Sequence, residues 1–479
     1  MSPMPAQQPK QTGSNRRVRR PKKVTPARWA AWLTLRRTFE DGAWTDRAFT
    51  AVAEQLELEG RERAFGQRLA FGTVQLAKRL DHVIAVLGKR PLTKIDPPVL
   101  HALRIGTYEL LELQDDDAPS SAHAAVDQAV ELVRGVVGER AVAFTNAILR
   151  RAQVDGASIL AKLDATRDED LATLLSMPEW LVTKVRAAHG DDGVAALRAQ
   201  NETFPGGTAF RVNAAHPDAA DALQVVTNCG VVARPAQLLT GLAVDGALQV
   251  EGSTAPVAPL VESGLLVPQS LASQLVGQQV LESIAGIESP RVLDMCAAPG
   301  GKSTHIAAGM PTEGELVAVE LHAHRANSIR ELARRTNTAD RITVQVADAT
   351  TLDVEELGAF DVVLLDAPCS GTGVLAGRPD ARWKRTPEDI AELVELQQSL
   401  LAAAARLVKP DGIVIYSTCS ILRDEDEDVV LAAPAALRPA PLETNAALRH
   451  DDAASLARTW PHRHGTEGFF IAGFQRASD

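Results

Sequence analysis

The chain has 479 residues, 45% of them hydrophobic and 23% charged, a composition typical of a globular protein with two or three domains. It holds 50 lysines and arginines against 61 acids, and this net charge of −11 argues, on average, against a nucleic-acid partner. It has no apolar run of about 18 residues, the length of a membrane helix, and no hydrophobic signal core, so we expect a cytoplasmic protein.

Residues 1–25 differ from this average. They hold seven basic residues and no acid, namely Lys10, Arg16, Arg17, Arg19, Arg20, Lys22 and Lys23. Such a segment predicts a disordered arm that attracts phosphates electrostatically. This attraction weakens with added salt and does not depend on nucleotide sequence. A solubilising tail explains the same composition equally well.

Residues 26–165 have helical periodicity throughout. Apolar residues recur at helical spacing in six stretches, at 27–39, 48–58, 61–87, 97–113, 122–137 and 141–152. This region predicts an all-α bundle.

Residues 166–265 predict a small α+β connector domain. Helical stretches at 168–175, 178–189 and 193–201 give way to β-like pieces at 207–213 and 247–251.

From residue 266 to 479, strand-like and helical stretches alternate. The strands are expected at 291–296, 315–321, 342–347, 360–366 and 412–417, and the helices at 302–310, 323–336 and 387–408. This alternation is typical of βαβ units in a doubly wound parallel sheet. The apolar run 468–474 predicts an additional edge strand.

A glycine turn follows the first of these strands and opens a helix. Glycines let the backbone approach a ligand, and a helix N-terminus offers free N–H groups. The segment ends in Gly301-Lys302-Ser303, as a P-loop does, and Asp366 suits a magnesium-binding strand, so an ATPase is a real competitor. A P-loop, however, needs glycine six positions before the lysine, and that position is Cys296.

Two acids favour a nucleoside cofactor without a triphosphate. Glu320 ends the second strand, about two dozen residues after the glycine turn, where an acid suits a ribose diol. Asp348 ends the third strand and could accept a hydrogen bond from an adenine amino group. S-adenosylmethionine fits this arrangement better than a nucleoside triphosphate, and a dinucleotide is disfavoured because the Gly-x-Gly-x-x-Gly pattern is missing.

Two of the four cysteines follow strand ends. Cys369 comes after the strand 360–366 and Cys419 after the strand 412–417, whereas Cys229 and Cys296 read as structural residues. No Cys-x-x-Cys pair exists, so a disulfide framework or a zinc site is not expected. If the two strands are neighbours in a parallel sheet, both thiols and Asp366 face one crevice.

This trio suits methyl transfer to cytosine C5, a carbon that is too weakly nucleophilic to react unaided. We expect Cys419 to add to C6 as a thiolate, which makes C5 reactive. Asp366 would contact N3 and the exocyclic amine, and Cys369 would assist proton removal or release. Burial as two small apolar residues is the ordinary alternative for free cysteines.

These residues closely resemble motifs of the RsmB/Sun (Fmu) family of ribosomal RNA 5-methylcytosine methyltransferases. The motifs are Asp-x-Cys-Ala-Ala-Pro-Gly-Gly-Lys at 294–302, Asp-Ala-Pro-Cys-Ser-Gly-x-Gly at 366–373 and Ser-Thr-Cys-Ser at 417–420. The N-terminal bundle looks like a NusB-type RNA-binding domain, from residues 103–110, 123–126 and 146–150.

The resemblance implies a class I, Rossmann-like methyltransferase domain with Cys419 as nucleophile, Cys369 and Asp366 beside it, and S-adenosylmethionine as cofactor. It implies that the cofactor contacts Glu320, Asp348, Asp366 and the loop residues Cys296, Ala297, Ala298, Pro299, Gly300, Gly301 and Lys302. The implied partner is 16S ribosomal RNA of the small subunit or its precursor; transfer RNA as substrate, or a non-catalytic role as an RNA-binding assembly factor, is the alternative. We expect the protein to be a monomer.

The chain departs from the family pattern at several positions. Glu320 stands where aspartate is usual, and Glu425-Asp426-Glu427 replaces Glu-Asn-Glu after the nucleophile. Gln269-Ser270 replaces Gln-Asp before the first strand. Basic residues near the predicted crevice are candidate RNA contacts, namely Lys302, Arg378, Arg382 and Lys384.

Overall fold

The computed structural model describes residues 19–113, 122–202, 204, 207–442, 448–450 and 453–478. The chain divides into two compact units, Met1–Asp164 and Ala165–Asp479. Most of the basic arm expected over residues 1–25 lies outside the described residues, and the domain boundaries at 165 and 265 stay predictions. None of the helices in the described part of the chain is long and apolar enough to cross a membrane.

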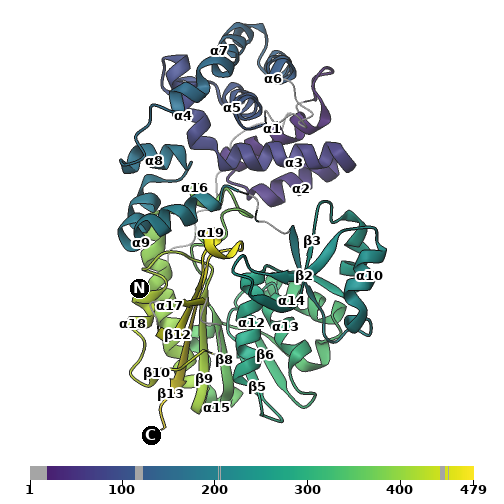
Figure 1. Ribbon diagram of the computed structural model, residues 1–479, viewed down its shortest axis with the longest axis vertical. Coiled ribbons are helices and arrows are strands. Elements are labelled where there is room, and N and C mark those ends of the chain that lie inside the picture. Colours follow the sequence, from purple (N-terminus) through teal and green to yellow (C-terminus); the bar gives the residue numbers. More distant parts are fainter. Residues whose placement is uncertain are drawn as a thin grey trace. The chain divides into compact units, whose positions relative to one another are not determined.

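The first unit is helical, as predicted (Figure 1). Its α-helices are α1 (Pro26–Phe39), α2 (Thr45–Gln55), α3 (Gly60–Gln75), α4 (Ala77–Gly88), α5 (Pro97–Glu112), α6 (Ala122–Val136) and α7 (Val142–Leu160). The stretch 61–87, expected as one helical run, is divided at Leu76 into α3 and α4. The periodicity hides the break because both helices stay apolar on one side: α3 packs on α1, whereas α4 packs on α7.

Helix α5 lies at the centre of this bundle and is tied to its neighbours by two paired arginines. Arg28 of α1 donates to Glu109 of α5 from Nε (3.0 Å) and Nη2 (2.5 Å), and both side chains are buried. Arg104 of α5 donates to Asp81 of α4 in the same two-bond arrangement, at 2.7 and 2.6 Å. Bidentate pairing satisfies these charges, which would be costly to bury alone.

The second unit begins with helices and a small antiparallel sheet. The helices are α8 (Asp168–Leu174), α9 (Glu179–Ala199), α10 (Ala222–Asn228) and α11 (Ala258–Glu262). The sheet has the order β2-β3-β1-β4, with strands β1 (Thr208–Val212), β2 (Ala233–Gln237), β3 (Ala243–Val250) and β4 (Leu266–Pro268). The expected helices 178–189 and 193–201 are joined as α9, which is kinked where Gly190 has a φ of 57°.

A nine-stranded sheet forms the rest of this unit, with the order β11-β12-β13-β9-β8-β5-β6-β7 and β10 paired to β13. Strands β5 (Arg291–Asp294), β6 (Glu315–Glu320), β7 (Ile342–Val346), β8 (Phe360–Asp366) and β9 (Val408–Thr418) run parallel. The chain winds from β5 out to β7 and returns on the other side through β8. The predicted doubly wound fold is therefore confirmed, and its switch point lies between β5 and β8.

Helices cover this sheet, and strands extend it on one side. The helices are α12 (Leu271–Ser283), α13 (Gly301–Gly309), α14 (Ala323–Arg335), α15 (Val354–Leu357), α16 (Ala381–Lys384), α17 (Pro387–Leu407), α18 (Glu427–Leu431) and α19 (Pro461–His464). The added strands are β10 (Leu437–Pro439), β11 (Arg449–His450), β12 (Ala453–Thr459) and β13 (Phe469–Arg476).

The expectation of an edge strand at 468–474 is wrong in one respect. Strand β13 is present, but it lies between β9 and β12 and does not form an edge. The residues of β13 up to Phe474 are buried, so this strand reads as a continuous apolar run. The sequence did not reveal β12, whose alternation is interrupted by polar residues.

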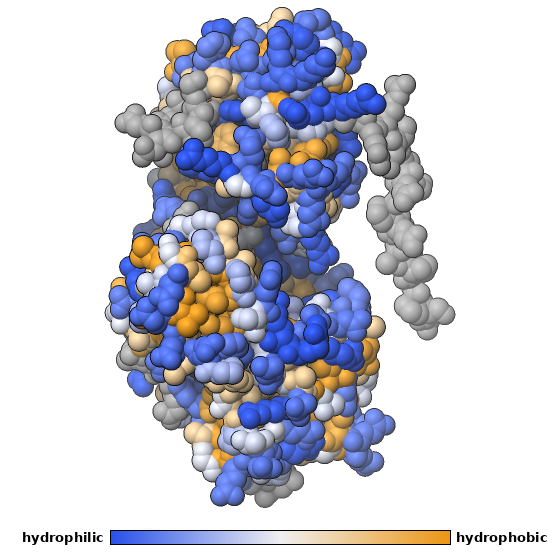
Figure 2. Space-filling view, turned by 90° about the vertical axis from the view of Figure 1, so that its right-hand side faces the viewer, coloured by the Kyte–Doolittle hydropathy of each residue, from blue (hydrophilic) through white to orange (hydrophobic). Residues whose placement is uncertain are grey.

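Both faces of the parallel sheet are buried, which explains its apolar strands. In β8, Val362 and Leu364 enter one core cluster, whereas Val363 and Leu365 enter another on the opposite face. Alternate residues of a strand point to opposite faces, so a strand covered on both sides needs apolar residues at every position. Figure 2 shows that hydrophilic residues cover most of the visible outer surface.

His305 is a titratable group enclosed by the packing of α12 against α13. Burial, together with the nearby charges of Arg211 and Lys302, lowers its pKa to about 3. The folded protein therefore keeps this imidazole neutral where the unfolded chain would bind a proton. Its contribution to stability is complete above pH 6.5 and is lost as the pH falls towards 3.

We predict that His305→Gln flattens the acid limb of the stability curve. Between pH 7 and pH 5 the wild type should lose about 2 kcal/mol more free energy of unfolding than the variant. Urea titrations of both proteins across this range measure the difference. Parallel curves would show that His305 does not carry this pH dependence.

Candidate active site

The site is built on the pairing of β8 with β9. These strands run parallel, with Asp366 opposite Ser417. The pairing continues for one residue past β8, since the Ala367 N–H donates to the carbonyl of Ser417 at 2.8 Å. The segments after both strands therefore leave the sheet at the same edge, where open α/β sheets bind ligands.

Cys369 and Cys419 meet at this edge, as the sequence predicts. Their sulfur atoms lie 3.2 Å apart, and the Cys419 N–H donates to Cys369 Sγ at 3.3 Å. Both are free cysteines and are only partly exposed. The two thiols therefore share one small volume.

The two thiols have different surroundings. The hydrogen bond with Cys419 and burial raise the pKa of Cys369 well above its usual value. Cys369 therefore keeps its proton at neutral pH and can donate its S–H to the sulfur of Cys419. This arrangement favours Cys419 over Cys369 as the nucleophile.

Asp366 and Lys302 form an ion pair beside the thiols. Lys302 Nζ donates to Asp366 Oδ2 at 2.8 Å, and Ser417 Oγ donates to Asp366 Oδ1 at 2.8 Å. Burial lowers the pKa of Lys302, but Asp366 and Cys419 outweigh it and raise the pKa overall. Lys302 therefore keeps its positive charge next to the two thiols.

A buried carboxylate fixes the two cysteine-bearing segments to each other. Glu425 Oε1 accepts from the Ser370 N–H (2.8 Å), and its Oε2 accepts from Ser370 Oγ (2.5 Å) and Ser420 Oγ (2.6 Å). Ser370 follows Cys369, and Ser420 follows Cys419. Glu425 also accepts from Gln397 Nε2 at 3.1 Å, so four donors hold a carboxylate that is fully buried.

Gly373 lets these segments approach closely. Its N–H donates to the carbonyl of Cys419 at 2.9 Å, and its own carbonyl accepts from the Gly468 N–H at 2.9 Å. A Cβ at this position would lie 1.9 Å from the Gly468 carbonyl oxygen. Only glycine fits here without moving the backbone that carries Cys419.

The glycine loop after β5 is fixed by backbone hydrogen bonds to neighbouring strands. The Met295 N–H donates to Leu364 of β8 (3.0 Å), and the Ala297 N–H donates to Val319 of β6 (2.9 Å). Gly300 has a φ of 104°, in the left-handed region that glycine tolerates, and α13 begins at the next residue.

The start of α13 fits a small ligand. No side chain caps this helix, and a Cβ placed on Gly301 would meet nothing nearer than Gln269, at 4.0 Å. The first N–H groups of the helix thus have no side-chain cap, and there is room for a ligand beside Gly301. Cys296, in contrast, packs against the core, and burial raises its pKa, so it contributes through its backbone.

The two predicted cofactor acids differ in environment. Glu320 is buried at the end of β6, where it accepts from the His322 N–H (3.0 Å) and lies 3.4 Å from Arg325. Asp348 is exposed after β7, and its Oδ1 accepts from the N–H (2.9 Å) and the hydroxyl (2.7 Å) of Thr350. Asp348 therefore also caps its own turn, a structural role that the sequence did not reveal.

Several residues important for the site were missed or misread from the sequence. Arg382, a candidate RNA contact, is buried and donates to the Ser176 carbonyl and to Asn201 Oδ1, so it has a structural role. Asp294 is buried beneath the loop and accepts from Ser303 Oγ at 2.7 Å; burial raises its pKa to about 6. The role of Glu425 was missed because its partners are distant in sequence, although its Glu-Asp-Glu motif was a visible signal.

Among the described residues, no group of three or more His, Cys, Asp or Glu side chains could hold a metal ion.

Family models match both units. The model for 16S rRNA methyltransferase RsmB/F matches residues 283–475, and the NusB family model matches residues 25–154. Ribosomal RNA small subunit methyltransferase B of Pseudomonas putida is 32% identical over 428 residues, covering 88% of this chain and 93% of that protein. The protein of the same name from Sodalis glossinidius is 33% identical over 421 residues, covering 87% and 90%.

Solved structures share the fold. The crystal structure of PH0851 has a TM-score of 0.75 and 24% identity, covering 95% of this chain and 100% of that chain. The crystal structure of NSun6 from Pyrococcus horikoshii with SFG has a TM-score of 0.54 and 21% identity, covering 64% and 100%. The alignments with the two relatives cover nearly the whole length of each relative. The chain therefore belongs to the RsmB/F family of 16S rRNA methyltransferases and carries a NusB-family region ahead of its methyltransferase region.

Proposed function

We propose that this protein methylates C5 of a cytosine in small-subunit ribosomal RNA through a covalent bond between Cys419 and C6 of the base. The observation that carries the proposal is the pair of thiols 3.2 Å apart beside Asp366, at the ends of β8 and β9. Two relatives named ribosomal RNA small subunit methyltransferase B support ribosomal RNA as the acceptor.

The methyl donor of this family member is S-adenosylmethionine, which supplies an electrophilic methyl group when bound. We assign its binding to residues 296–302 together with Glu320, Asp348 and Asp366. The buried carboxylate of Glu320 suits a ribose diol, and the second oxygen of Asp348 suits an adenine amino group. The uncapped start of α13 leaves N–H groups for the remaining polar atoms.

In this proposal the two thiols act in sequence. Cys419 Sγ bonds to C6 of the base, which makes C5 nucleophilic. Asp366 retains lone pairs for the exocyclic amine, and Lys302 supplies a neighbouring positive charge. After C5 is methylated, its proton passes to solvent water, and the electron pair of that C–H bond re-forms the C5–C6 double bond. The bond between C6 and Cys419 then breaks with its electron pair leaving on Cys419 Sγ as a thiolate. Cys369, which keeps its own proton, assists this release by donating to the departing sulfur.

Bisulfite sequencing tests the acceptor. Small-subunit ribosomal RNA from cells that contain this protein should hold a cytosine that resists conversion, because a 5-methyl group blocks deamination. The same position should convert fully when the gene is deleted. If the two RNA samples convert identically, cytosine C5 of this RNA is not the acceptor.

Cys419→Ala and Cys369→Ala should fail in different ways. Cys419→Ala removes the nucleophile, so methyl transfer should fall by about three orders of magnitude or more and no covalent RNA adduct should form. Cys369→Ala should slow release, so the adduct should accumulate on denaturing gels. Cys229→Ala is the matched control, since Cys229 lies in another core cluster and should retain normal turnover. Normal turnover of Cys419→Ala would refute the assigned roles.

Glu425→Gln tests whether the carboxylate aligns the thiols. An amide keeps the shape but offers one acceptor oxygen in place of two, so the donors that face its NH2 group lose their acceptor. A hydrogen bond to a charged group contributes about 1.5–3 kcal/mol, which predicts a roughly 10- to 100-fold lower kcat.

The Glu425→Gln variant should keep its affinity for S-adenosylmethionine, because Glu425 does not contact the glycine loop. Mild oxidation should also form a disulfide between Cys369 and Cys419 more slowly in this variant than in the wild type. Glu392→Gln, an exposed change on α17, is the control. A wild-type kcat together with wild-type oxidation would show that Glu425 does not align the thiols.

A further inference from the structure

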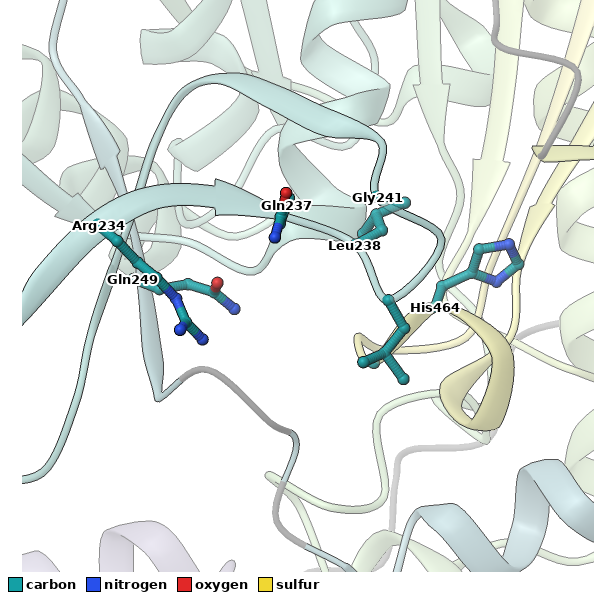
Figure 3. Close-up of a pocket in the computed structure, with 8 residues that line it drawn as sticks. Arg234, Gln237, Leu238, Gly241, Gln249 and His464 are labelled. Carbon is teal, nitrogen blue, oxygen red and sulfur yellow. The ribbon is translucent and has the colours of Figure 1, made fainter.

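Three cavities lie next to one another around α19. The first has a volume of about 350 Å³ and shares His464 with the second, of about 160 Å³. The second shares Gln249 and Gly465 with the third, of about 330 Å³. In Figure 3, Arg234 and Gln249 extend from neighbouring strands of the small sheet into the same space, with His464 on the far side. We call these three adjoining cavities the α19 groove.

The α19 groove lies at the edge of the sheet that carries the two thiols. Thr418, the last residue of β9, pairs with Phe470 at the start of β13, and Phe469 pairs with Thr459 at the end of β12. The α19 segment connects β12 to β13, so it emerges at the same edge as Cys419. Neighbouring strands are about 4.8 Å apart, which places the groove within one or two nucleotides of the acceptor base.

One wall of the groove contacts the Cys419 segment directly. His189 of α9 lines the groove, and its Nε2–H donates to the carbonyl of Ile421 at 3.2 Å. Ile421 lies two residues after Cys419. The other end of the groove reaches Gln269, the side chain nearest to Gly301 at the start of α13. The groove thus lies beside both the Cys419 segment and the start of α13, where the cofactor is proposed to bind.

The groove is lined by more arginines than acids. Among the described residues that line it, four are arginines (Arg234, Arg449, Arg458 and Arg463) and two are acids (Asp192 and Glu467). Asp192 is already paired with Arg463, and Arg449 is exposed. Arg458 is buried and paired with Asp426 and Glu427, so its charge is neutralised inside the protein. The cations that the groove offers to an anion are therefore the exposed Arg449 and Arg234, the latter in a solvent-exposed pair with Glu251.

The remaining lining mixes amide side chains with apolar residues and histidines. The amides of Gln237, Gln249 and Gln269 line successive parts of the groove. Gln249 is buried, and Gln269 already accepts from Arg211 and donates to Ser273. The exposed amide of Gln237 can donate and accept, which suits a ribose hydroxyl or a base edge, while arginine forks suit phosphates. Trp460 is buried under the guanidinium of Arg458, so it offers no stacking platform, and electrostatics must supply the affinity.

We propose that the α19 groove binds the single-stranded RNA that flanks the acceptor cytosine, with Arg449 contacting a phosphate at one end and Arg234 contacting a phosphate in the middle. This inference rests on the proposed RNA substrate and adds a binding site for the strand beyond the reacting base. Phosphate contacts of this kind fix the register of a strand without reading its sequence.

Arg234→Gln and Arg449→Gln test the groove in the full-length protein. The probe is a fluorescent single-stranded RNA of about a dozen nucleotides containing one cytosine, with binding read by anisotropy without cofactor. Each variant should bind about three- to tenfold more weakly at low salt and lower the slope of log affinity against log salt by about 0.7. In turnover, KM for RNA should rise while kcat and the affinity for S-adenosylmethionine stay unchanged.

Arg334→Gln is the matched control. Like Arg234, Arg334 is exposed and paired with one glutamate, but it lies in the last turn of α14, away from the groove. Wild-type affinity and salt slope in both groove variants would overturn the proposal, and so would equal losses in the control. Displacement of the RNA by an acidic peptide as readily as by unlabelled RNA would assign the groove to a protein partner.

Failure of the proposed function gives a different result. In that case the unchanged protein would transfer no methyl group to any cytosine, whatever the variants do to binding. If methyl transfer is normal and the groove variants bind RNA normally, only the groove assignment is lost.

Discussion

The parallel pairing of β8 with β9 is the constraint on which the rest of the site depends. It sets Asp366 opposite Ser417 and sends both following segments off the same edge of the sheet. Two thiols separated by 50 residues in sequence then lie 3.2 Å apart. The apolar strands exist because the sheet is covered on both faces, and this rigid support lets short loops hold reactive groups in fixed positions.

Polar groups buried between the two segments complete the alignment. Glu425 accepts hydrogen bonds from the residues that follow each cysteine, and Gly373 allows backbone contact where a side chain would collide. A buried carboxylate is costly unless its lone pairs are satisfied, and here four donors satisfy them. The same arrangement makes the thiols unequal, because Cys369 is enclosed and holds its proton. The same buried packing therefore aligns the two thiols and makes the pKa of Cys369 differ from its usual value.

The edge of the sheet also determines where the proposed cofactor site and the α19 groove lie relative to the thiols. The glycine loop and Glu320 lie on the side of β5 and β6, and the α19 groove lies on the side of β13 and β12. These positions follow from the strand order, with the switch point between β5 and β8 separating two sets of loops. The arginines of the groove belong to a chain that is acidic overall, so net charge concealed the local charge that matters for an RNA partner.

The sequence by itself determined the repeating patterns and the local motifs. Apolar runs separated by helical stretches predicted the doubly wound sheet, and long motifs around Cys369 and Cys419 identified the family. These features are encoded within a few neighbouring residues, so they can be read without knowing the fold. Two cases show the limit of this approach: one helical run becomes two helices at Leu76, and β13 lies inside the sheet. Periodicity shows which residues are buried, but it does not show which neighbouring helix or strand buries them.

Only the tertiary structure decided which distant groups meet. Glu425 joins segments that the sequence describes separately, Arg382 is buried against α8 and α9 instead of facing RNA, and Asp348 caps its own turn. The α19 groove draws its arginines from β2, β11, β12 and α19. The physical reason is the same in each case: hydrogen bonds and ion pairs act over a few ångströms in space, and the fold alone brings remote residues within that range.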